Sequence, residues 1–440
     1  MSFDAHRIFN GSSEPADYLT NLTLSATDEG KLRKAREEIR EAIRRGLGDW
    51  DELITKRELF DVALMHVEPP KLRPKFRMQG SFAYRTCNRP AQCPPQEIDL
   101  DDGLFLPISY LTGNGLHHPA VVSEGLFRAV EQALEPLCES RGWTLNKDKS
   151  SCVRVELDEG AHVDIALYAI SDADYTVLLE KAAHTVGSHN ASQAYRELAE
   201  ARDLTDELYE GLPSEGIMLA HREDGWKPSD PRKLEDWFRT ALETHGEQLR
   251  RVCRYLKGWR DHQWNASRIA SIALMSAAIT AYDEAFEEVP ENRDDLAMLM
   301  VAERLPSVLS GQIDNPVVDG QRLDEGWSTE QRADFVAEAE VLLERLRHVL
   351  AGTDDPRTAI QGLIAAFGPR VPNEPNLIKS EDMRAPSTKS AIGAPAILKS
   401  SREQMAASIA ELDDADRQRR AEAAAREIES SGSASKPWLR

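Results

Sequence analysis

Apolar residues recur at helical spacing in two stretches of the first half of the 440-residue chain. The stretch KLRKAREEIREAIRRGL, with acidic residues just before it, predicts a helix from about Asp28 to Leu47 with Thr27 as its N-cap. A second stretch, EGLFRAVEQALEPLCESRG, predicts a helix that ends at Gly142.

Three other runs have the composition of β-strands. They are EIDLDDGLFLP (97–107), SCVRVELDE (151–159) and AHVDIALYAI (161–170). The helix that ends at Gly142 lies between the first two. Strands mixed with helices in this way indicate an α/β or α+β lobe.

From about Lys233 the pattern becomes helical. KLEDWFRTALETHGEQLRRVCRYLKGWRDHQW and SIALMSAAITAYDEAFEE both carry apolar stripes with a period of 3.6 residues, which predicts a helical lobe up to about residue 370. After Pro369 the chain is rich in Pro, Ser, Ala and charge, without an aromatic residue until Trp438. This composition is typical of a disordered segment, in which only residues 401–428 predict a transient helix.

Charge and cysteine content exclude several classes of protein. The formal net charge is −21, which argues against a broad basic face for nucleic acid. A phosphate-bearing ligand would instead need a local cluster of Lys and Arg, or metal ions. The five cysteines contain no CxxC pair, so neither a disulfide framework nor a zinc site is indicated. No signal peptide or apolar run of about 18 residues is seen, and we expect a soluble, cytoplasmic protein.

The run QEIDLDDGLFLP places several carboxylates in a predicted strand. Because side chains alternate along a strand, Asp99 and Asp101 point to one face, where they could share divalent cations. Asp102 falls on the opposite face and is expected to cap a turn with Gly103. In the later strand AHVDIALYAI, Asp164 stands alone among apolar neighbours and could supply a third carboxylate.

A solvated edge strand with acidic decoration would also explain Asp-x-Asp. The upstream run MQGSFAYRT favours the metal site, because Gly80 permits close approach of the backbone to phosphate and Ser81 adds an N–H group and a hydroxyl. No GxxxxGK[ST] loop or complete dinucleotide fingerprint occurs. Gly-Ser, then Asp-x-Asp, then a single Asp on a later strand looks like the arrangement of the polymerase-β-like nucleotidyltransferases.

The motifs also resemble one bacterial family. QGSFAYRTCNRP…PPQEIDLDDGLFLP is similar to the cGAS/DncV-like nucleotidyltransferases (CD-NTases) of CBASS antiphage defence, and most similar to the DncV-type cyclic dinucleotide synthases. HVDIALYAI, WKPSDPRKLEDWF, CRYLKGWRDHQW, SIALMSAA and AFGPRV resemble later blocks of the family in the same order. The resemblance implies an α+β fold, with a polymerase-β-like lobe of mixed sheet followed by a helical lobe. We expect a nucleotidyltransferase core with an N-terminal spanning helix at 1–205, the helical lobe at 206–372 and a largely disordered tail at 373–440.

The resemblance implies a Mg²⁺-dependent enzyme that joins two purine NTPs, ATP and GTP, into a cyclic GMP-AMP-like second messenger. Asp99, Asp101 and Asp164 would be catalytic and would hold two Mg²⁺ ions, with Mn²⁺ as an alternative metal. A transferase that adds nucleotides to RNA or to a small molecule, and a non-catalytic nucleotide sensor on the same fold, are the other hypotheses. The family also implies a downstream effector reached through the product, and an E1/E2-like partner that conjugates the C-terminus, although Arg440 is not the small final residue that is usual there.

The resemblance further implies a set of nucleotide-binding residues: Gln79, Gly80, Ser81, Tyr84, Arg154, Ser229, Asp230, Lys257, Ser271 and Asp319. Four of them have ordinary structural alternatives. Tyr84 could be a half-buried core aromatic, Lys257 part of a solvated helix face, and Ser229-Asp230 a helix start. The spacing around Asp319 departs from the family pattern. His162, two residues before Asp164, is expected to be a hydrogen-bonded structural histidine.

Overall fold

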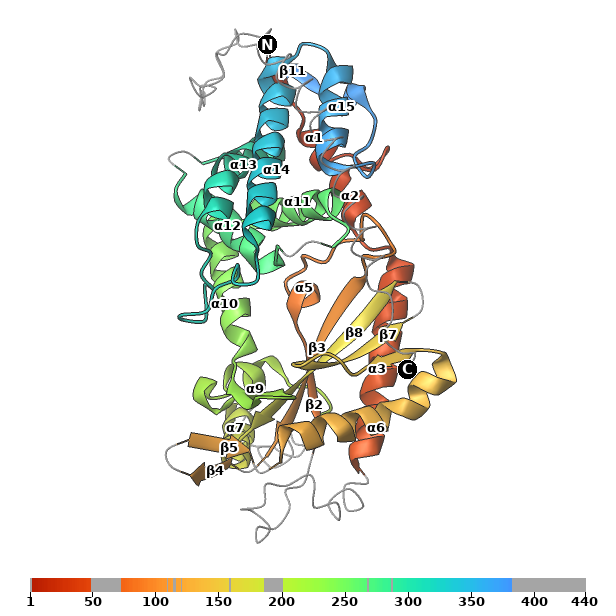
Figure 1. Ribbon diagram of the computed structural model, residues 1–440, viewed down its shortest axis with the longest axis vertical. Helices are drawn as coiled ribbons and strands as arrows, with labels where there is room; N and C mark the ends of the chain where they lie inside the picture. Colours follow the sequence, from red (N-terminus) through yellow and green to blue (C-terminus); the bar gives the residue numbers. More distant parts are fainter. Residues whose placement is uncertain are drawn as a thin grey trace, which may run out of the picture. The chain divides into compact units, whose positions relative to one another are not determined.

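The chain forms two compact units in the computed structural model (Figure 1). The helical unit combines Met1–Leu22 with Glu247–Arg440, and the sheet unit is Thr23–Gly246. The structure describes residues 2–48, 73–108, 110–113, 116–119, 121–157, 160–185, 201–266, 269–285 and 288–381.

This division differs from the expected boundary at 205/206. The first 22 residues pack into the helical unit, where the Phe9 ring lies 5.1 Å from that of Tyr255 and 5.5 Å from that of Phe367. The 206–246 segment belongs to the sheet unit, in which Phe238 packs against Tyr84. Such long-range aromatic packing cannot be read from local composition, which is why the expected boundaries differ.

The sheet unit is built on a mixed sheet of seven strands. Its strands are β2 (Lys75–Met78), β3 (Ile98–Pro107), β6 (Thr144–Asn146), β7 (Cys152–Leu157), β8 (Ala161–Ile170), β9 (Met218–His221) and β10 (Gly225–Pro228). The order is β10-β9-β8-β3-β2, and β7 pairs with both β8 and β6. β3 and β8 run parallel, whereas the other pairs are antiparallel. The three predicted strands are confirmed as β3, β7 and β8.

The remaining elements of this unit are helices and one hairpin. They are α3 (Ala26–Gly48), α5 (Gly80–Ala83), α6 (Ser123–Arg141), α7 (Asp172–Thr185), α9 (Asp206–Glu210), the short 3₁₀ turn η3 (Ser214–Gly216), α10 (Pro231–His245), β4 (Tyr110–Gly113) and β5 (Leu116–Pro119). α6 ends at a left-handed Gly142, as predicted. α3 begins two residues earlier than expected, because Ser25 Oγ accepts the Asp28 N–H, so the expectation of Thr27 as N-cap is wrong.

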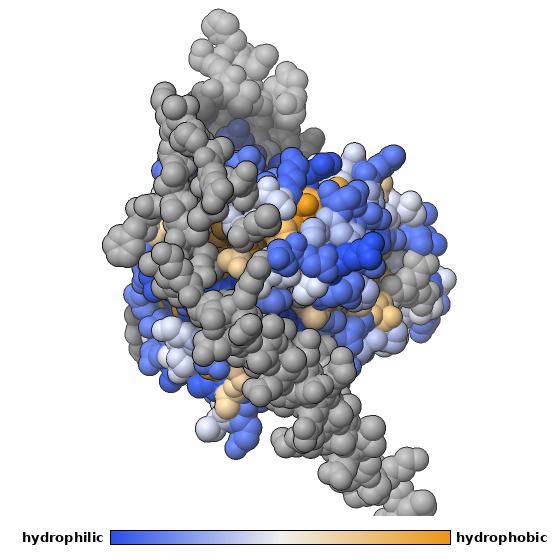
Figure 2. All heavy atoms as spheres, turned by 90° about the horizontal axis from the view of Figure 1, so that it is seen from above, coloured by the Kyte–Doolittle hydropathy of each residue, from blue (hydrophilic) through white to orange (hydrophobic). Residues whose placement is uncertain are grey.

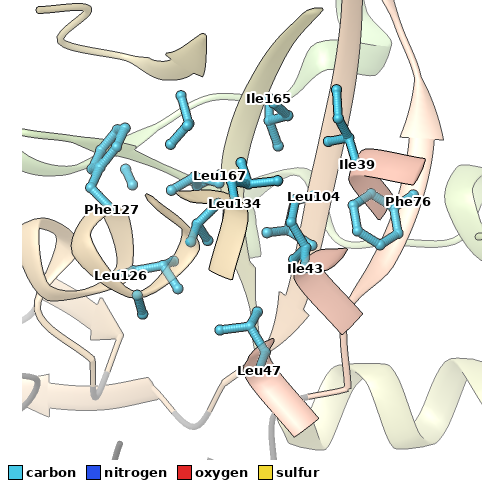
Figure 3. Packing of buried hydrophobic residues seen from close by; sticks show 14 of the residues in the cluster. Ile39, Ile43, Leu47, Phe76, Leu104, Leu126, Phe127, Leu134, Ile165 and Leu167 are labelled. Carbon is cyan, nitrogen blue, oxygen red and sulfur yellow. The ribbon is translucent and has the colours of Figure 1, made fainter. Parts of the chain in front are cut away.

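One face of the sheet packs on α3 and α6. Figure 3 shows side chains from these helices and from β2, β3 and β8 pointing toward one another, and every one of the labelled residues is fully buried. On β3 this face carries Leu100 and Leu104, and on β8 it carries Ile165 and Leu167. Because side chains alternate, the odd-numbered residues of β3 point to the opposite face. The even-numbered residues of β8 up to Asp164 point to the same opposite face.

One end of the opposite face carries aromatic side chains. There Phe105 stacks on Tyr168 with ring centroids 4.8 Å apart, and Tyr209 of α9 packs edge-on against Phe105. These aromatic rings belong to a second apolar cluster that includes residues of α7 and α9. Toward the start of β3, acidic side chains replace the apolar ones on this face.

The helical unit confirms the predicted second lobe of helices. It contains β1 (Ser2–Asp4), α1 (His6–Phe9), α2 (Tyr18–Leu22), α11 (Glu247–Gln263), α12 (Ser271–Asp283), α13 (Asp294–Ser310), α14 (Thr329–Arg347), the π-helical turn η4 (His348–Gly352), α15 (Pro356–Phe367), the 3₁₀ turn η5 (Pro375–Leu377) and β11 (Lys379–Glu381). β1 pairs with β11, so the tail expected to begin at residue 373 is ordered at least to residue 381. The transient helix expected at 401–428 lies outside the described residues.

The described surface is largely polar, and the cysteines form no disulfide. Figure 2 shows that hydrophilic residues dominate the described surface on the face drawn there. Among the described residues, the exposed large apolar side chains are Val177 and Val318. Within the same residues, no helix is both long and apolar enough to cross a bilayer. All five cysteines are free thiols.

Candidate active site

Strand pairing brings the predicted catalytic carboxylates to one face of the sheet. In the parallel β3–β8 ladder, Asp101 lies opposite Asp164 and Asp99 lies opposite His162. Paired residues on neighbouring strands point to the same side, so these four side chains share a face. β8 pairs with β3 along its whole length, whereas β2 pairs only with Asp102–Phe105. The strand is therefore internal at that end, and the stretch with Asp99 and Asp101 has β8 as its strand neighbour.

Three of these side chains lie close enough to share one metal ion. One potential ligand atom from each of Asp99, His162 and Asp164 lies within 4.8 Å of the others. Asp101 is not in this group. Its carboxylate instead lies against Gly80, where an added Cβ would be 1.8 Å from Asp101 Oδ2. Gly80 has φ +61°, so both its backbone conformation and the nearby carboxylate require glycine.

Arg154 of β7 neutralises Asp164. Its Nε and Nη2 donate to the two carboxylate oxygens of Asp164, each at 2.7 Å. The pair follows from the β7–β8 register, in which Arg154 lies directly opposite Asp164. Such a two-pronged contact fixes the orientation of the carboxylate as well as its charge.

His162 lies between two carboxylates and is buried. Its Nδ1 is 2.7 Å from Glu97 Oε2, and its Nε2 is 3.0 Å from Asp99 Oδ1. The second contact is not aligned for a hydrogen bond, and neither Nε2 nor Asp99 Oδ1 has a hydrogen-bond partner, although both atoms are buried. Burial lowers the pKa of His162, but the close Asp99 carboxylate and the hydrogen bond to Glu97 outweigh it, and the pKa is raised overall. His162 was expected to be a hydrogen-bonded structural histidine, and it makes such a hydrogen bond through Nδ1 only.

The expectation for Asp102 is wrong. β3 continues to Pro107, so Asp102 is an internal strand residue and caps no turn. Its side chain is fully buried on the core face, where Arg40 of α3 donates to both carboxylate oxygens at 2.7 Å. The sequence gives no sign of this partner, because Arg40 lies 62 positions away on a helix with many charges.

The Gly-Ser turn lies next to the acidic face. The Gln79 N–H donates to the Asp101 carbonyl at 2.9 Å, and α5 begins directly afterwards with Gly80 and Ser81. Gln79 Oε1 is 3.3 Å from the Tyr168 hydroxyl, whereas its buried Nε2 has no hydrogen-bond partner. Ser81 is half-buried.

Three other predicted residues of the sheet unit have structural contacts. Tyr84 is half-buried, with its ring centroid 6.0 Å from that of Phe238, and burial raises the pKa of its hydroxyl. The Ser229 N–H donates to a backbone carbonyl at 3.1 Å. Asp230 caps α10 by accepting the Arg232 N–H and is ion-paired with the Arg232 guanidinium at 2.7 Å. Burial opposes ionisation of Asp230, but the hydrogen bonds from Arg232 and Ser214 lower its pKa.

Lys257, Ser271 and Asp319 belong to the helical unit. Lys257 lies in α11 and is only 6% exposed, so a solvated helix face does not explain it. Ser271 is the first residue of α12 and accepts a hydrogen bond from Arg260 Nη1 at 3.0 Å. Asp319 is exposed in a turn.

Sequence reasoning missed the partners of the acidic residues. Arg154 was predicted as a nucleotide contact, not as the counter-charge of Asp164, and Glu97 was not predicted at all. A usable signal exists for His162, because it lies two residues before Asp164 on the same strand and so points to the same face. The contact of Arg154 depends on the β7–β8 register. The Arg40–Asp102 pair has no such signal.

Comparison with known proteins identifies the family. Residues 74–168 match the family described as "Cyclic GMP-AMP synthase DncV-like, nucleotidyltransferase domain", and residues 246–381 match "Cyclic GMP-AMP synthase, C-terminal domain". A cyclic GMP-AMP synthase of Vibrio cholerae serotype O1 is 32% identical over 334 residues, covering 71% of each chain. The chain belongs to the DncV-like cyclic GMP-AMP synthase family. A second member, from Escherichia coli strain TW11681, is 31% identical over 313 residues, covering 69% of each chain.

Solved structures of the family have the same architecture. A mutant of the Vibrio cholerae di-nucleotide cyclase DncV in complex with ATP, GTP and a further ligand aligns with a TM-score of 0.70 and 25% identity, over 87% of this chain and all of that one. DncV with the linear intermediate 5′ pppA(3′,5′)pG aligns with a TM-score of 0.68 and 26% identity, over the same shares of the two chains. The predicted α+β fold and the nucleotidyltransferase class are thereby confirmed.

Proposed function

We propose that this chain is a Mg²⁺-dependent synthase that joins ATP and GTP into a cyclic GMP-AMP-like dinucleotide. The observation that supports this most is the cluster of ligand atoms from Asp99 and Asp164, on the sheet face next to the Gly80-Ser81 turn, in a chain of the DncV-like family. Two separate strands supply the acids, and the turn supplies N–H groups close to them.

The donor set fits divalent cations. Asp99 and Asp164 offer the hard carboxylate oxygens that Mg²⁺ prefers, and the buried Asp99 Oδ1 has no hydrogen-bond partner. We assign two Mg²⁺ ions, or Mn²⁺ in their place, to Asp99, Asp101 and Asp164. When bound, such ions neutralise the charge of a triphosphate and lower the pKa of an attacking hydroxyl.

The remaining residues bind and orient the nucleotides. Ser81, at the start of α5, offers its N–H and hydroxyl to the terminal phosphates of the donor, with Gln79 and Gly80 lining the same pocket. Tyr84 stacks on a base. Arg154, held beside Asp164, reaches a purine or phosphate, while Ser229, Asp230 and Asp319 are the weaker candidates for nucleotide contacts.

In the helical unit, Lys257 and Ser271 bind the triphosphate. α12 begins at Ser271, and its N-cap Ala270 offers no side chain to the free N–H groups of the first turn. Because such N–H groups attract anions, this helix start suits a phosphate next to the Ser271 hydroxyl.

The reaction consists of two nucleotidyl transfers. In each, a ribose hydroxyl attacks the α-phosphorus of a triphosphate, the bond to the β-phosphate oxygen breaks and pyrophosphate leaves. The first transfer gives a linear dinucleotide, and the second closes the ring after the intermediate has turned round in the pocket. Fixed charges and donors that need no reorganisation supply most of the stabilisation in such phosphoryl chemistry.

We further propose that the product acts as a cytoplasmic second messenger in CBASS antiphage signalling, through an effector that binds the product. Conjugation by an E1/E2-like partner would involve the C-terminal segment, which lies outside the described residues.

Incubation with radiolabelled ATP and GTP and Mg²⁺ tests this function. The wild-type protein is expected to give a product that resists phosphatase, while D99A, D101A and D164A give none. D148A, which removes an exposed carboxylate of the same unit, is the control and is expected to be fully active. A phosphatase-sensitive product would reject cyclisation, and labelling of added RNA or a small acceptor would favour the alternative transferase. Binding of nucleotide without turnover would identify a sensor.

A further inference from the structure

His162 has an unsatisfied ring nitrogen directed at the acidic cluster. The residue is 94% buried, and Nε2 lies 3.0 Å from Asp99 Oδ1 without a hydrogen bond. A buried polar atom without a partner is costly and rare in native proteins, so it calls for a specific explanation.

The contact with Glu97 identifies the nature of that nitrogen. Nδ1 is 2.7 Å from the Glu97 carboxylate, an acceptor only, so the ring proton belongs on Nδ1. Without a metal ion, a protonated Nε2 would face the Asp99 carboxylate, as the 3.0 Å ion pair indicates. In the neutral ring, Nε2 presents a lone pair at the same place, where a metal ion would take the position of that proton.

The contact of Nδ1 with a carboxylate, which leaves Nε2 for another ligand, is the arrangement that orients metal-binding histidines. Such residues commonly donate the other ring N–H to a carboxylate, which fixes both the tautomer and the ring orientation. Here Glu97 would be that carboxylate, and Nε2, together with oxygens of Asp99 and Asp164, would lie within the 4.8 Å span of the cluster.

We propose that Asp99, His162 and Asp164 form a mixed nitrogen–oxygen site that binds a transition-metal ion of the Mn²⁺, Co²⁺ or Zn²⁺ class through His162 Nε2. Imidazole favours these ions, whereas Mg²⁺ takes oxygen ligands. The inference shares two ligands with the metal site of the proposed function and therefore rests on it. It adds a nitrogen ligand and a preference for Mn²⁺, Co²⁺ or Zn²⁺ over Mg²⁺.

The surroundings of the site suit an exchangeable ion. The Asp99 side chain is 48% exposed, which leaves a route from solvent and room for water or phosphate oxygens in the coordination shell. Arg154 holds Asp164 in place through both carboxylate oxygens, each of which retains a further lone pair for an ion.

Mn²⁺ binding to the full-length, nucleotide-free protein tests the site. Electron paramagnetic resonance titration is expected to show Mn²⁺ bound at least tenfold more tightly than Mg²⁺, measured by competition. Pulsed spectra of the bound ion are expected to show nitrogen coupling from one imidazole. Bound Mn²⁺ without nitrogen coupling, or equal affinity for Mg²⁺, would overturn the inference.

Two variants and one control sharpen the result. H162Q is expected to abolish the nitrogen coupling, and E97Q to weaken Mn²⁺ binding by about 10–100-fold while retaining the coupling. H221Q removes a histidine that is ion-paired with Asp224 in the same unit and is expected to change neither readout. If the variants misfold, the wild-type spectrum still shows whether an imidazole nitrogen binds the Mn²⁺ ion.

The experiment separates failure of this inference from failure of the proposed function. Absence of the nitrogen signal in the wild-type protein, together with normal cyclic dinucleotide synthesis in Mg²⁺, would reject the histidine ligand alone. A nitrogen signal from a protein that makes no dinucleotide from any NTP pair would reject the synthase and leave the metal site standing.

Discussion

Gly80→Ala isolates the contribution of the Gly-Ser turn to the catalytic carboxylates. An added Cβ would lie 1.8 Å from Asp101 Oδ2 and 2.7 Å from its Cγ, whereas real Cβ contacts are essentially never below 3.0 Å. The carboxylate must therefore move by at least about 1.2 Å, the difference between 1.8 and 3.0 Å. A displacement of about 1 Å in a reacting geometry can cost about 100-fold in rate, so we expect a loss of about that size.

Gly225→Ala is the matched control for backbone strain. Gly225 has φ +74°, close to the +61° of Gly80, but no atom lies within 4 Å of its Cβ position. Both substitutions should therefore cost about 1–2 kcal/mol of unfolding free energy, because both place a side chain in the left-handed region.

The assay compares initial rates of dinucleotide synthesis with urea unfolding of the same proteins. We expect similar loss of stability in G80A and G225A, and loss of synthesis in G80A only. Equal synthesis by the two variants would refute the reasoning, because it would mean that the position of the Asp101 carboxylate does not matter. Equal loss of synthesis would mean that backbone strain, not the carboxylate, limits activity.

Two further predictions concern stability. Asp102→Asn should cost about 3–5 kcal/mol in urea unfolding, because it leaves the buried Arg40 guanidinium without its counter-charge. Burial alone would raise the pKa of Asp324, but hydrogen bonds from Arg322 and Arg332 lower it to about 2. Asp324 therefore stabilises the fold above its unfolded pKa of about 4, and this contribution is lost as the pH falls toward 2. Asp324→Asn should reduce the loss of stability over that interval.

Exposed carboxylates provide the controls for both measurements. Glu29→Gln, which breaks an exposed pair with Arg33, should cost no more than about 0.5 kcal/mol. A cost for Asp102→Asn as small as this would show that Arg40 finds another partner, for example through its contact with Asp203. An unchanged acid profile for Asp324→Asn would contradict the assignment of its low pKa.

Local pattern predicted the elements of the site well. Alternation in EIDLDDGLFLP and AHVDIALYAI was enough to place Asp99 and Asp164 on the face opposite the main apolar core, because Leu100 and Ile165 point to that core. Gly142 was predicted as the end of α6 for an equally local reason, since glycine is favoured there, and the structure shows it in the left-handed conformation.

Pairing between distant residues was not predictable from the same pattern. Asp102 looked like a turn residue because Gly103 follows it, and only the position of Arg40 on α3 makes a buried carboxylate tolerable there. The contact of Arg154 with Asp164 depends on the register of β7, which no single run specifies. The unit to which residues 1–22 belong depends on aromatic contacts more than 240 positions away, such as that between Phe9 and Tyr255.

The pairing of Ser2–Asp4 with Lys379–Glu381 has a consequence for biosynthesis. Residues 1–22 are translated before the sheet unit, yet their partners in the helical unit are translated after residue 246. The sheet unit, by contrast, is one continuous segment and can complete its core while translation continues. While the whole sheet unit is synthesised, the apolar side chains of residues 1–22, including Phe9 and Tyr18, therefore lack their partners. Chaperone binding would matter most during that interval.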